Sequence, residues 1–231
     1  MLSKLESPEC RDIITGAIKL LNKGDAEKAV RNLVRMPDKV MHKETWNSPR
    51  LMADSLAKIH DKDILTECVL RFAEGLFEYR TGGTKLAYKA LNKAIDLSGT
   101  LTSVPGWALK SAAMCSLALA LYRTSDLEHS IRLARESANL ARQHNALWLE
   151  GSARLAMGNA LRYLPGERSR AKAALEEAYR LYSAAQPADH LGLAFIRRQE
   201  ARLSMDAGKP SEALSLIREA KNGFRRAHEY R

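Results

Sequence analysis

A recurring order of polar and apolar positions runs along most of the chain. A short turn containing Gly, Ser or Asp is followed by a small residue, a bulky apolar residue four positions later and a second small residue three positions after that. Ala87, Leu91 and Ala94 are one example. Spacings of four and three residues place side chains on one face of an α-helix, so the pattern predicts helices separated by tight turns.

Local start and stop signals divide the chain into about 11 expected helices. Ser7-Pro8 favours a helix start, Asp63 is an expected N-cap, and Ser125 with Glu128 has the spacing of a capping box. The residue before a proline disfavours helix, so the second helix is expected to end near 36–37. The expected helices are 8–21, 26–36, 48–60, 63–80, 84–98, 106–123, 126–144, 146–163, 167–184, 189–207 and 210–228.

The pattern repeats at nearly constant intervals. The equivalent small residues Ala29, Ala87, Ser130, Ala171 and Ala213 are separated by 58, 43, 41 and 42 positions. Such a period predicts a stacked array of helix hairpins, and we interpret 1–231 as one continuous domain. The long first interval predicts an additional or irregular helical segment at about 38–61.

Small residues are expected where the two helices of a hairpin cross, because a larger side chain would push them apart. On this argument Gly75 should face Ala87. Bulky residues at equivalent positions, namely Leu33, Leu91, Leu175 and Ile217, should fill the seam with the next hairpin. No polar capping helix follows the last pattern, so we expect the array to continue in a longer parent chain or to be closed by dimerisation through a terminal helix.

Composition narrows the possible functions. The cysteines Cys10, Cys68 and Cys115 have no paired spacing, and Cys115 is expected to be a small core residue. The sequence lacks phosphate-binding glycine loops, nucleophile elbows and zinc-binding helix motifs. No enzymatic activity, catalytic residue, cofactor or metal site is therefore expected. No secretory leader and no membrane-spanning apolar run is found, so we expect a cytoplasmic protein without membrane contact.

Charge is distributed unevenly. The net charge is +10, and residues 106–231 carry 20 Lys and Arg against 13 Asp and Glu, whereas residues 1–105 carry 17 against 14. Arginine strongly outnumbers lysine in the second half, and its planar guanidinium suits carboxylate or phosphate. This bias indicates an acidic ligand. The alternative interpretation is a solvated surface that keeps the protein soluble.

The order of small residue, turn, Ala, bulky apolar residue and Ala resembles the tetratricopeptide repeat over roughly residues 8–228. The period exceeds the 34 residues of that family and resembles its long-helix variants, and the usual aromatic residue near the start of the first helix is absent. The resemblance implies a right-handed α-solenoid of antiparallel hairpins that form a superhelix. It also implies that the first helix of each hairpin lines a concave groove.

The resemblance also implies which side chains line that groove. Carried onto this sequence, the family's groove positions are Phe72, Leu76, Cys115, Leu119, Leu155, Asn159, Arg198 and Arg202, with Tyr79, Tyr122, Arg123, Arg162 and Tyr163 farther along the same faces. Asn159 facing Arg198 and Arg202 resembles part of the carboxylate clamp of some family members. The arginines could instead pair with neighbours such as Glu200, and the tyrosines could simply pack against adjacent helices.

These observations predict a scaffold that binds a protein or peptide, with the basic half favouring an acidic ligand. The alternative is a regulatory domain, such as the sensor part of a transcription regulator, or a nucleic-acid-associated protein that contacts phosphates through its arginine-rich half. Nucleic acid is the less favoured partner.

Overall fold

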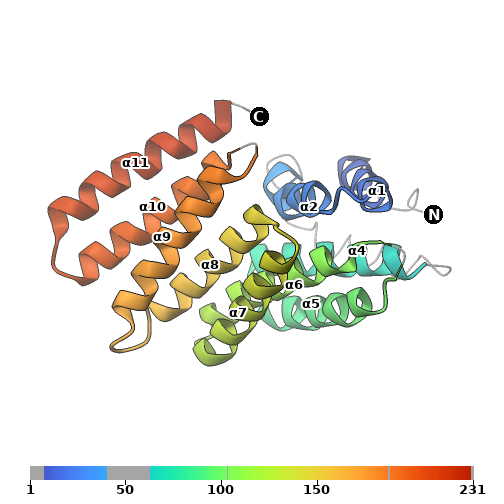
Figure 1. Ribbon diagram of the computed structural model, residues 1–231, viewed down its shortest axis with the longest axis horizontal. Helices are drawn as coiled ribbons and strands as arrows, with labels where there is room; N and C mark the ends of the chain where they lie inside the picture. Colours follow the sequence, from blue (N-terminus) through green and yellow to red (C-terminus); the bar gives the residue numbers. More distant parts are fainter. Residues whose placement is uncertain (1–7, 41–62, 103, 187, 230–231) are drawn as a thin grey trace. The chain divides into compact units, whose positions relative to one another are not determined.

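The computed structural model describes residues 8–40, 63–102, 104–186 and 188–229 (Figure 1). Ten helices make up the regular secondary structure of these residues, and they contain no strand. The expected all-α fold is therefore confirmed. The expected helix at 48–60 lies outside the described residues. None of the described helices combines the length and apolar character that a membrane span requires.

The chain divides into two compact units, residues 1–120 and 121–231, and each is described by itself. In the first unit, α1 (Pro8–Asn22) pairs with α2 (Ala26–Val40), and α4 (Ile64–Thr81) pairs with α5 (Thr84–Gly99). Helix α4 also contacts α1 and α2, and α6 (Gly106–Arg123) begins in this unit. The core includes Ile14, Leu33, Phe72 and Phe77, which are fully buried.

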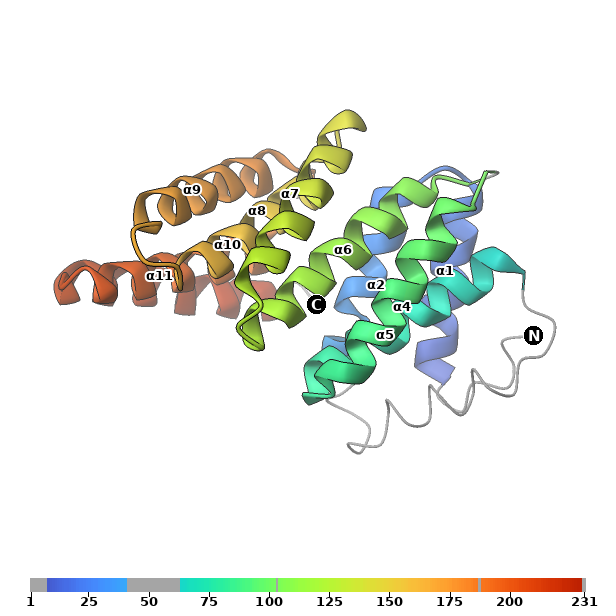
Figure 2. The same cartoon turned by 90° about the horizontal axis from the view of Figure 1, so that it is seen from below.

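The second unit contains five helices that pack in sequence order (Figures 1 and 2). Helix α7 (Leu127–Gln143) contacts α8 (Leu147–Leu161), which pairs with α9 (Arg168–Ala184). Helix α10 (His190–Asp206) contacts both α8 and α9 and pairs with α11 (Pro210–Glu229). The first helices of successive hairpins, α8 and α10, are therefore neighbours. The single continuous domain stays a prediction.

Most helix ends lie within two residues of their expected positions, and two local expectations are wrong. Helix α2 continues through Pro37 to Val40, because one proline removes one backbone hydrogen bond without preventing a further turn. The capping box of Ser125 and Glu128 does not form. Ser125 adopts a left-handed conformation with φ 66° in the turn, and Asp126 precedes the first residue of α7.

The N-terminus of α4 is capped as expected. A carboxylate oxygen of Asp63 accepts a hydrogen bond from the Thr66 backbone N–H at 2.8 Å, and the other accepts one from the Thr66 hydroxyl at 2.6 Å. Burial raises the pKa of Asp63, but these hydrogen bonds outweigh that effect and leave it lowered. The α4–α5 turn uses Gly82 at φ 93°, where its N–H reaches the Glu78 carbonyl.

Close helix crossings occur at the expected glycines, but the partner differs from the one expected. A Cβ atom added to Gly75 would lie 2.5 Å from Leu91 Cγ, so Gly75 receives the Leu91 side chain and not Ala87 as the expectation had it. A Cβ atom at Gly158 would likewise lie 2.8 Å from Leu175 Cδ2. In these two hairpins the bulky residue of the pattern therefore packs into the notch left by the glycine of its own hairpin.

At a second helix crossing, the two hairpins of the second unit have their glycine on different helices. In the α8–α9 hairpin the glycine is on the first helix, where a Cβ atom at Gly151 would lie 3.4 Å from Leu181 Cβ. In the α10–α11 hairpin the equivalent positions are Ala194 and Gly223, and a Cβ atom at Gly223 would lie 2.8 Å from Ala194 Cβ. The glycine has therefore moved to the second helix.

The bulky residues are buried except at the last position, but Leu91 and Leu175 pack against a glycine of their own hairpin, whereas the expectation placed them in the seam with the next one. Leu33 and Leu91 are fully buried and Leu175 is 1% exposed, whereas Ile217 is 48% exposed. In the α10–α11 hairpin the first helix has Ala201 where α8 has Gly158, so it offers no glycine notch. No described helix covers α11 from the side of Ile217 either, so the expected burial of Ile217 is wrong.

Candidate functional site

The predicted groove residues of the second unit gather on α8 and α10. On the first helices of the last two hairpins, Gly158 and Ala201 are equivalent and lie 43 residues apart. By the same interval Leu155 is equivalent to Arg198, and Asn159 is equivalent to Arg202. Each pair of residues is four apart on its helix and therefore shares a helical face, and the two helices are in contact. We call the surface made by Leu155, Asn159, Arg162, Arg198 and Arg202 the α8/α10 face.

Asn159 carries an unsatisfied polar atom in this face. Its side chain is only 7% exposed, and its Oδ1 atom has no hydrogen-bond partner among the described residues. A buried carbonyl oxygen without a partner destabilises a fold by about 1–3 kcal/mol. The atom is itself buried, so a ligand N–H can donate to it only once a neighbouring side chain has moved aside.

The two arginines on α10 are exposed, and each also contacts a side chain of its own helix. The guanidinium of Arg198 lies over the Phe195 ring at 4.9 Å from its centroid. Arg202 donates to the amide oxygen of Gln199 at 3.2 Å. Glu200, the neighbour named as an alternative partner, pairs with Arg197 at 2.8 Å.

Arg162 and Tyr163 lie at the end of the same face, and their interactions differ. Arg162 donates to the Asp206 carboxylate at 2.8 Å, so its charge is neutralised within the protein. Its guanidinium also lies over the Tyr163 ring at 4.3 Å from the centroid. Tyr163 is half exposed and stacks on Tyr122, with 6.2 Å between ring centroids and 28° between ring planes. Arg123 follows Tyr122 and is exposed.

The predicted groove residues of the first unit are placed differently. Phe72 is 0% exposed and Leu76 is 4% exposed, so both side chains fill the core and present almost no area to a ligand. Tyr79 is half-buried near the end of α4. A pattern of positions on one helix predicts its face but does not show how completely neighbouring helices cover that face.

A buried polar network that the sequence did not indicate connects α8, α9 and α10. The Trp148 indole N–H donates to the Asp189 carboxylate at 2.6 Å, and the other oxygen of this carboxylate accepts the Gly192 N–H at 3.1 Å. The hydroxyls of Ser152 and Tyr182 lie 2.7 Å apart. These contacts fix α8 against α10 and so hold the α8/α10 face in position. A buried indole requires an acceptor, but sequence alone does not identify it.

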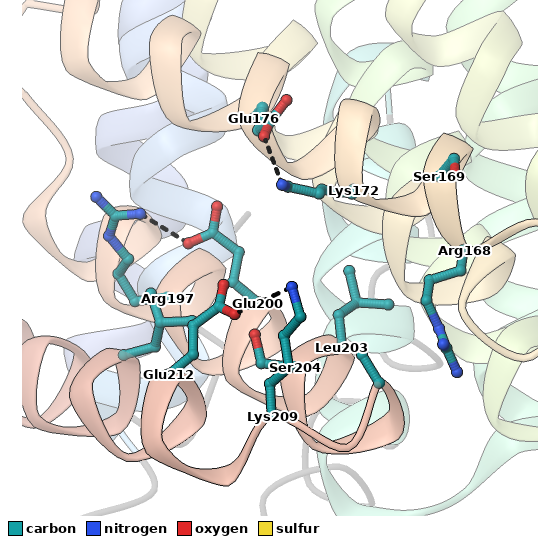
Figure 3. A pocket seen from close by; sticks show the side chains of 12 residues that line it. Arg168, Ser169, Lys172, Glu176, Arg197, Glu200, Leu203, Ser204, Lys209 and Glu212 are labelled. Atoms are coloured by element: carbon teal, nitrogen blue, oxygen red, sulfur yellow. Dashed lines mark hydrogen bonds and ion pairs between the residues drawn. The ribbon is translucent and has the colours of Figure 1, made fainter.

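The second unit also has a charged pocket between α9, α10 and α11, with a volume of about 350 Å³ (Figure 3). Figure 3 shows Lys172, Arg197 and Lys209 each paired with an acid, whereas Arg168 is drawn without one. Lys172 lies 3.7 Å from Glu176, and Lys209 lies 3.7 Å from Glu212. Arg197 binds both Glu200 and Glu219, and Arg168 donates to the Asp206 carbonyl at 2.6 Å. This pocket therefore offers an anion little unbalanced positive charge, and the α8/α10 face is the stronger candidate.

The cysteines have the character of core residues. Burial raises the pKa of Cys115 to about 12, and burial together with the nearby Glu67 carboxylate raises that of Cys68 to about 12. At neutral pH the nucleophilic thiolate form of either is negligible. The described part of the chain contains no group of three or more His, Cys, Asp or Glu side chains arranged to hold a metal ion.

Comparisons with known proteins place the fold. No protein-family model and no curated protein matches the sequence. Among solved structures, BtubC (BKLC) from P. vanneervenii is similar with a TM-score of 0.62 and 14% identity, over 98% of this chain and 94% of that one. A putative kinesin light chain from Podosopora anserina with nearly identical TPR-like repeats has a TM-score of 0.54 and 13% identity, over 95% of this chain and 96% of that one.

A Rap protein complexed with competence and sporulation factor is also similar. Its TM-score is 0.67 at 13% identity, and the match covers 94% of this chain and 65% of that one. At these identities the likeness concerns the fold. Together with the all-helical structure and its repeated hairpins, it shows that the chain has the fold of a tetratricopeptide-like helical-repeat protein.

Proposed function

We propose that the chain is a non-enzymatic cytoplasmic scaffold whose α8/α10 face binds a peptide or protein segment bearing an acidic group. The observation that carries this proposal is the pair of exposed arginines, Arg198 and Arg202, on one face of α10, next to the helix in which Asn159 holds a buried Oδ1 without a partner. A peptide supplies both complements, since its backbone N–H groups can donate to Asn159 and its carboxylate can accept from the arginines.

The similarity to a Rap protein complexed with competence and sporulation factor supports binding as the class of function. The state of the aromatic residues favours a peptide over single-stranded nucleic acid. Tyr122 and Tyr163 already stack on one another, and Arg162 is neutralised by Asp206, so fewer ring faces and cations remain for bases and phosphates.

The test uses an array of eight-residue peptides, each made with a free and with an amidated C-terminus, and the full chain. We expect binding that depends on peptide sequence and on at least one carboxylate. Changing Arg198 and Arg202 together to Ala should weaken it on the order of 100-fold, because each removes a hydrogen bond between charged groups. Changing exposed Arg132 and Arg135 on α7 to Ala removes the same charge elsewhere and serves as the control.

Equal losses in the two double variants would contradict a localised site. Affinity for arbitrary single-stranded nucleic acid that falls steeply with rising salt, without sequence-dependent peptide binding, would instead favour the phosphate-binding alternative. Helical content measured by circular dichroism verifies that each variant is folded.

A further inference from the structure

One side of α11 presents apolar side chains to solvent. Leu214 is 50% exposed and Ile217 is 48% exposed. One repeat earlier, on α9, the equivalents of Ile217 and Lys221 are Leu175 and Tyr179. Leu175 is buried, and the Tyr179 ring is covered by the guanidinium of Arg197 from α10 at 4.2 Å. Leu175 packs into the Gly158 notch of α8 in its own hairpin, whereas the following hairpin contacts α9 at Tyr179, and this second contact gives a template for what α11 could receive.

The two sides of α11 differ in charge. Two of its acidic residues face the preceding helices, since Glu219 pairs with Arg197 of α10 at 3.0 Å and Glu212 lines the pocket shared with α9. The opposite side carries Leu214, Ile217, Arg218, Lys221 and Arg225, whose spacing places them on one helical face. We call these five residues the open face of α11.

The open face combines exposed apolar area with unbalanced positive charge. Arg218, Lys221 and Arg225 are all exposed, and no ion pair is found for them within the described residues. Two copies of this face placed against each other would bring three cations of one chain against three of the other. Such like-charge contacts oppose the homodimer through a terminal helix that the sequence suggested.

We propose that the open face of α11 binds an amphipathic helix of another protein whose apolar stripe is flanked by Asp and Glu. The apolar stripe would cover Leu214 and Ile217, much as Arg197 of α10 covers Tyr179 of α9, and the acids would pair with the three cations. Helix-in-groove recognition uses apolar anchors at this spacing, and charge complementarity selects among partners. This surface is independent of the α8/α10 face.

The probe is a synthetic amphipathic helical peptide with Leu at heptad positions and Glu at the flanking positions, compared with an isomer that has Lys at the flanks. Binding to the full chain is followed by fluorescence anisotropy. We expect the Glu peptide to bind on the order of tenfold more tightly than the Lys peptide, and rising salt to reduce the difference. Changing Leu214 and Ile217 to Ser should abolish binding, with little loss of stability because both side chains are exposed.

Reversal of the charges provides the decisive control. A chain with Arg218→Glu, Lys221→Glu and Arg225→Glu should prefer the Lys peptide. Equal binding of both peptides, an unchanged preference after charge reversal, or no binding of the Glu peptide would overturn the proposal. It would also be overturned if wild-type chain dimerised in sedimentation and the Leu214→Ser, Ile217→Ser variant did not, since a second copy would then occupy the face. The Arg198→Ala, Arg202→Ala variant should bind both peptides as wild type does.

Discussion

Replacing Asn159 by Leu should make the protein more stable while impairing its proposed function. The side chain is 7% exposed and its Oδ1 atom has no partner among the described residues. Leu has a similar branched shape and no polar atom to desolvate, so the substitution removes a penalty of about 1–3 kcal/mol. For a chain of this size, each kcal/mol corresponds to a rise in Tm of about 2–4 °C.

The assay is thermal unfolding followed by circular dichroism, with Asn139→Leu as a matched control. Asn139 lies within helix α7 and is exposed, so the control gains the same helix propensity without removing a buried carbonyl. We expect the Tm of Asn159→Leu to exceed that of the control. In the peptide array, Asn159→Leu should lose affinity while the control keeps it.

A lower Tm for Asn159→Leu than for Asn139→Leu would refute this reasoning. It would mean that the Asn159 amide makes a stabilising hydrogen bond, for example to ordered water, and that it is not an acceptor left open for a ligand.

Two further predictions concern the first unit. Gly75→Ala should lower the free energy of unfolding by about 1–3 kcal/mol in urea denaturation, because its Cβ would clash with Leu91. In the control, Gly16→Ala, the added Cβ meets no atom within 4 Å and should stabilise the protein by up to about 1 kcal/mol. Equal effects of the two substitutions would contradict the close packing of Leu91 on Gly75. Burial, together with the nearby Glu74 carboxylate, raises the pKa of Glu78, so the folded state binds its proton more tightly and stability falls as pH rises through this pKa. Glu78→Gln should therefore stabilise the protein at pH 7 and have little effect below the ordinary glutamate pKa of 4.5, and an effect independent of pH would refute this assignment.

Sequence was sufficient for the helices because their ends depend on local chemistry. Helix α5 was expected at 84–98 and is observed at Thr84–Gly99, since Gly82 supplies the left-handed turn that ends the preceding helix. The capping box at Ser125 failed because the turn itself needed a left-handed residue there, and this requirement outweighed the capping motif.

The site was less predictable because burial depends on residues far apart in the sequence. The repeat interval predicts that Asn159 and Arg202 hold equivalent positions on their helices. The full burial of Phe72, in contrast, depends on several packed helices together. The contact between Trp148 and Asp189 spans 41 residues and depends on how one hairpin rests on the next. No pattern within a single hairpin contains that information.

The glycine that changes helices between the last two hairpins has a consequence for assembly of the protein. If α11 were to fold onto α8, Gly223 would meet Gly151, and two positions without a side chain would leave a void at this crossing. Repeat arrays risk exchanging similar helices while they fold. At this crossing α11 fits α10 better than α8, so the position of the glycine disfavours this particular exchange.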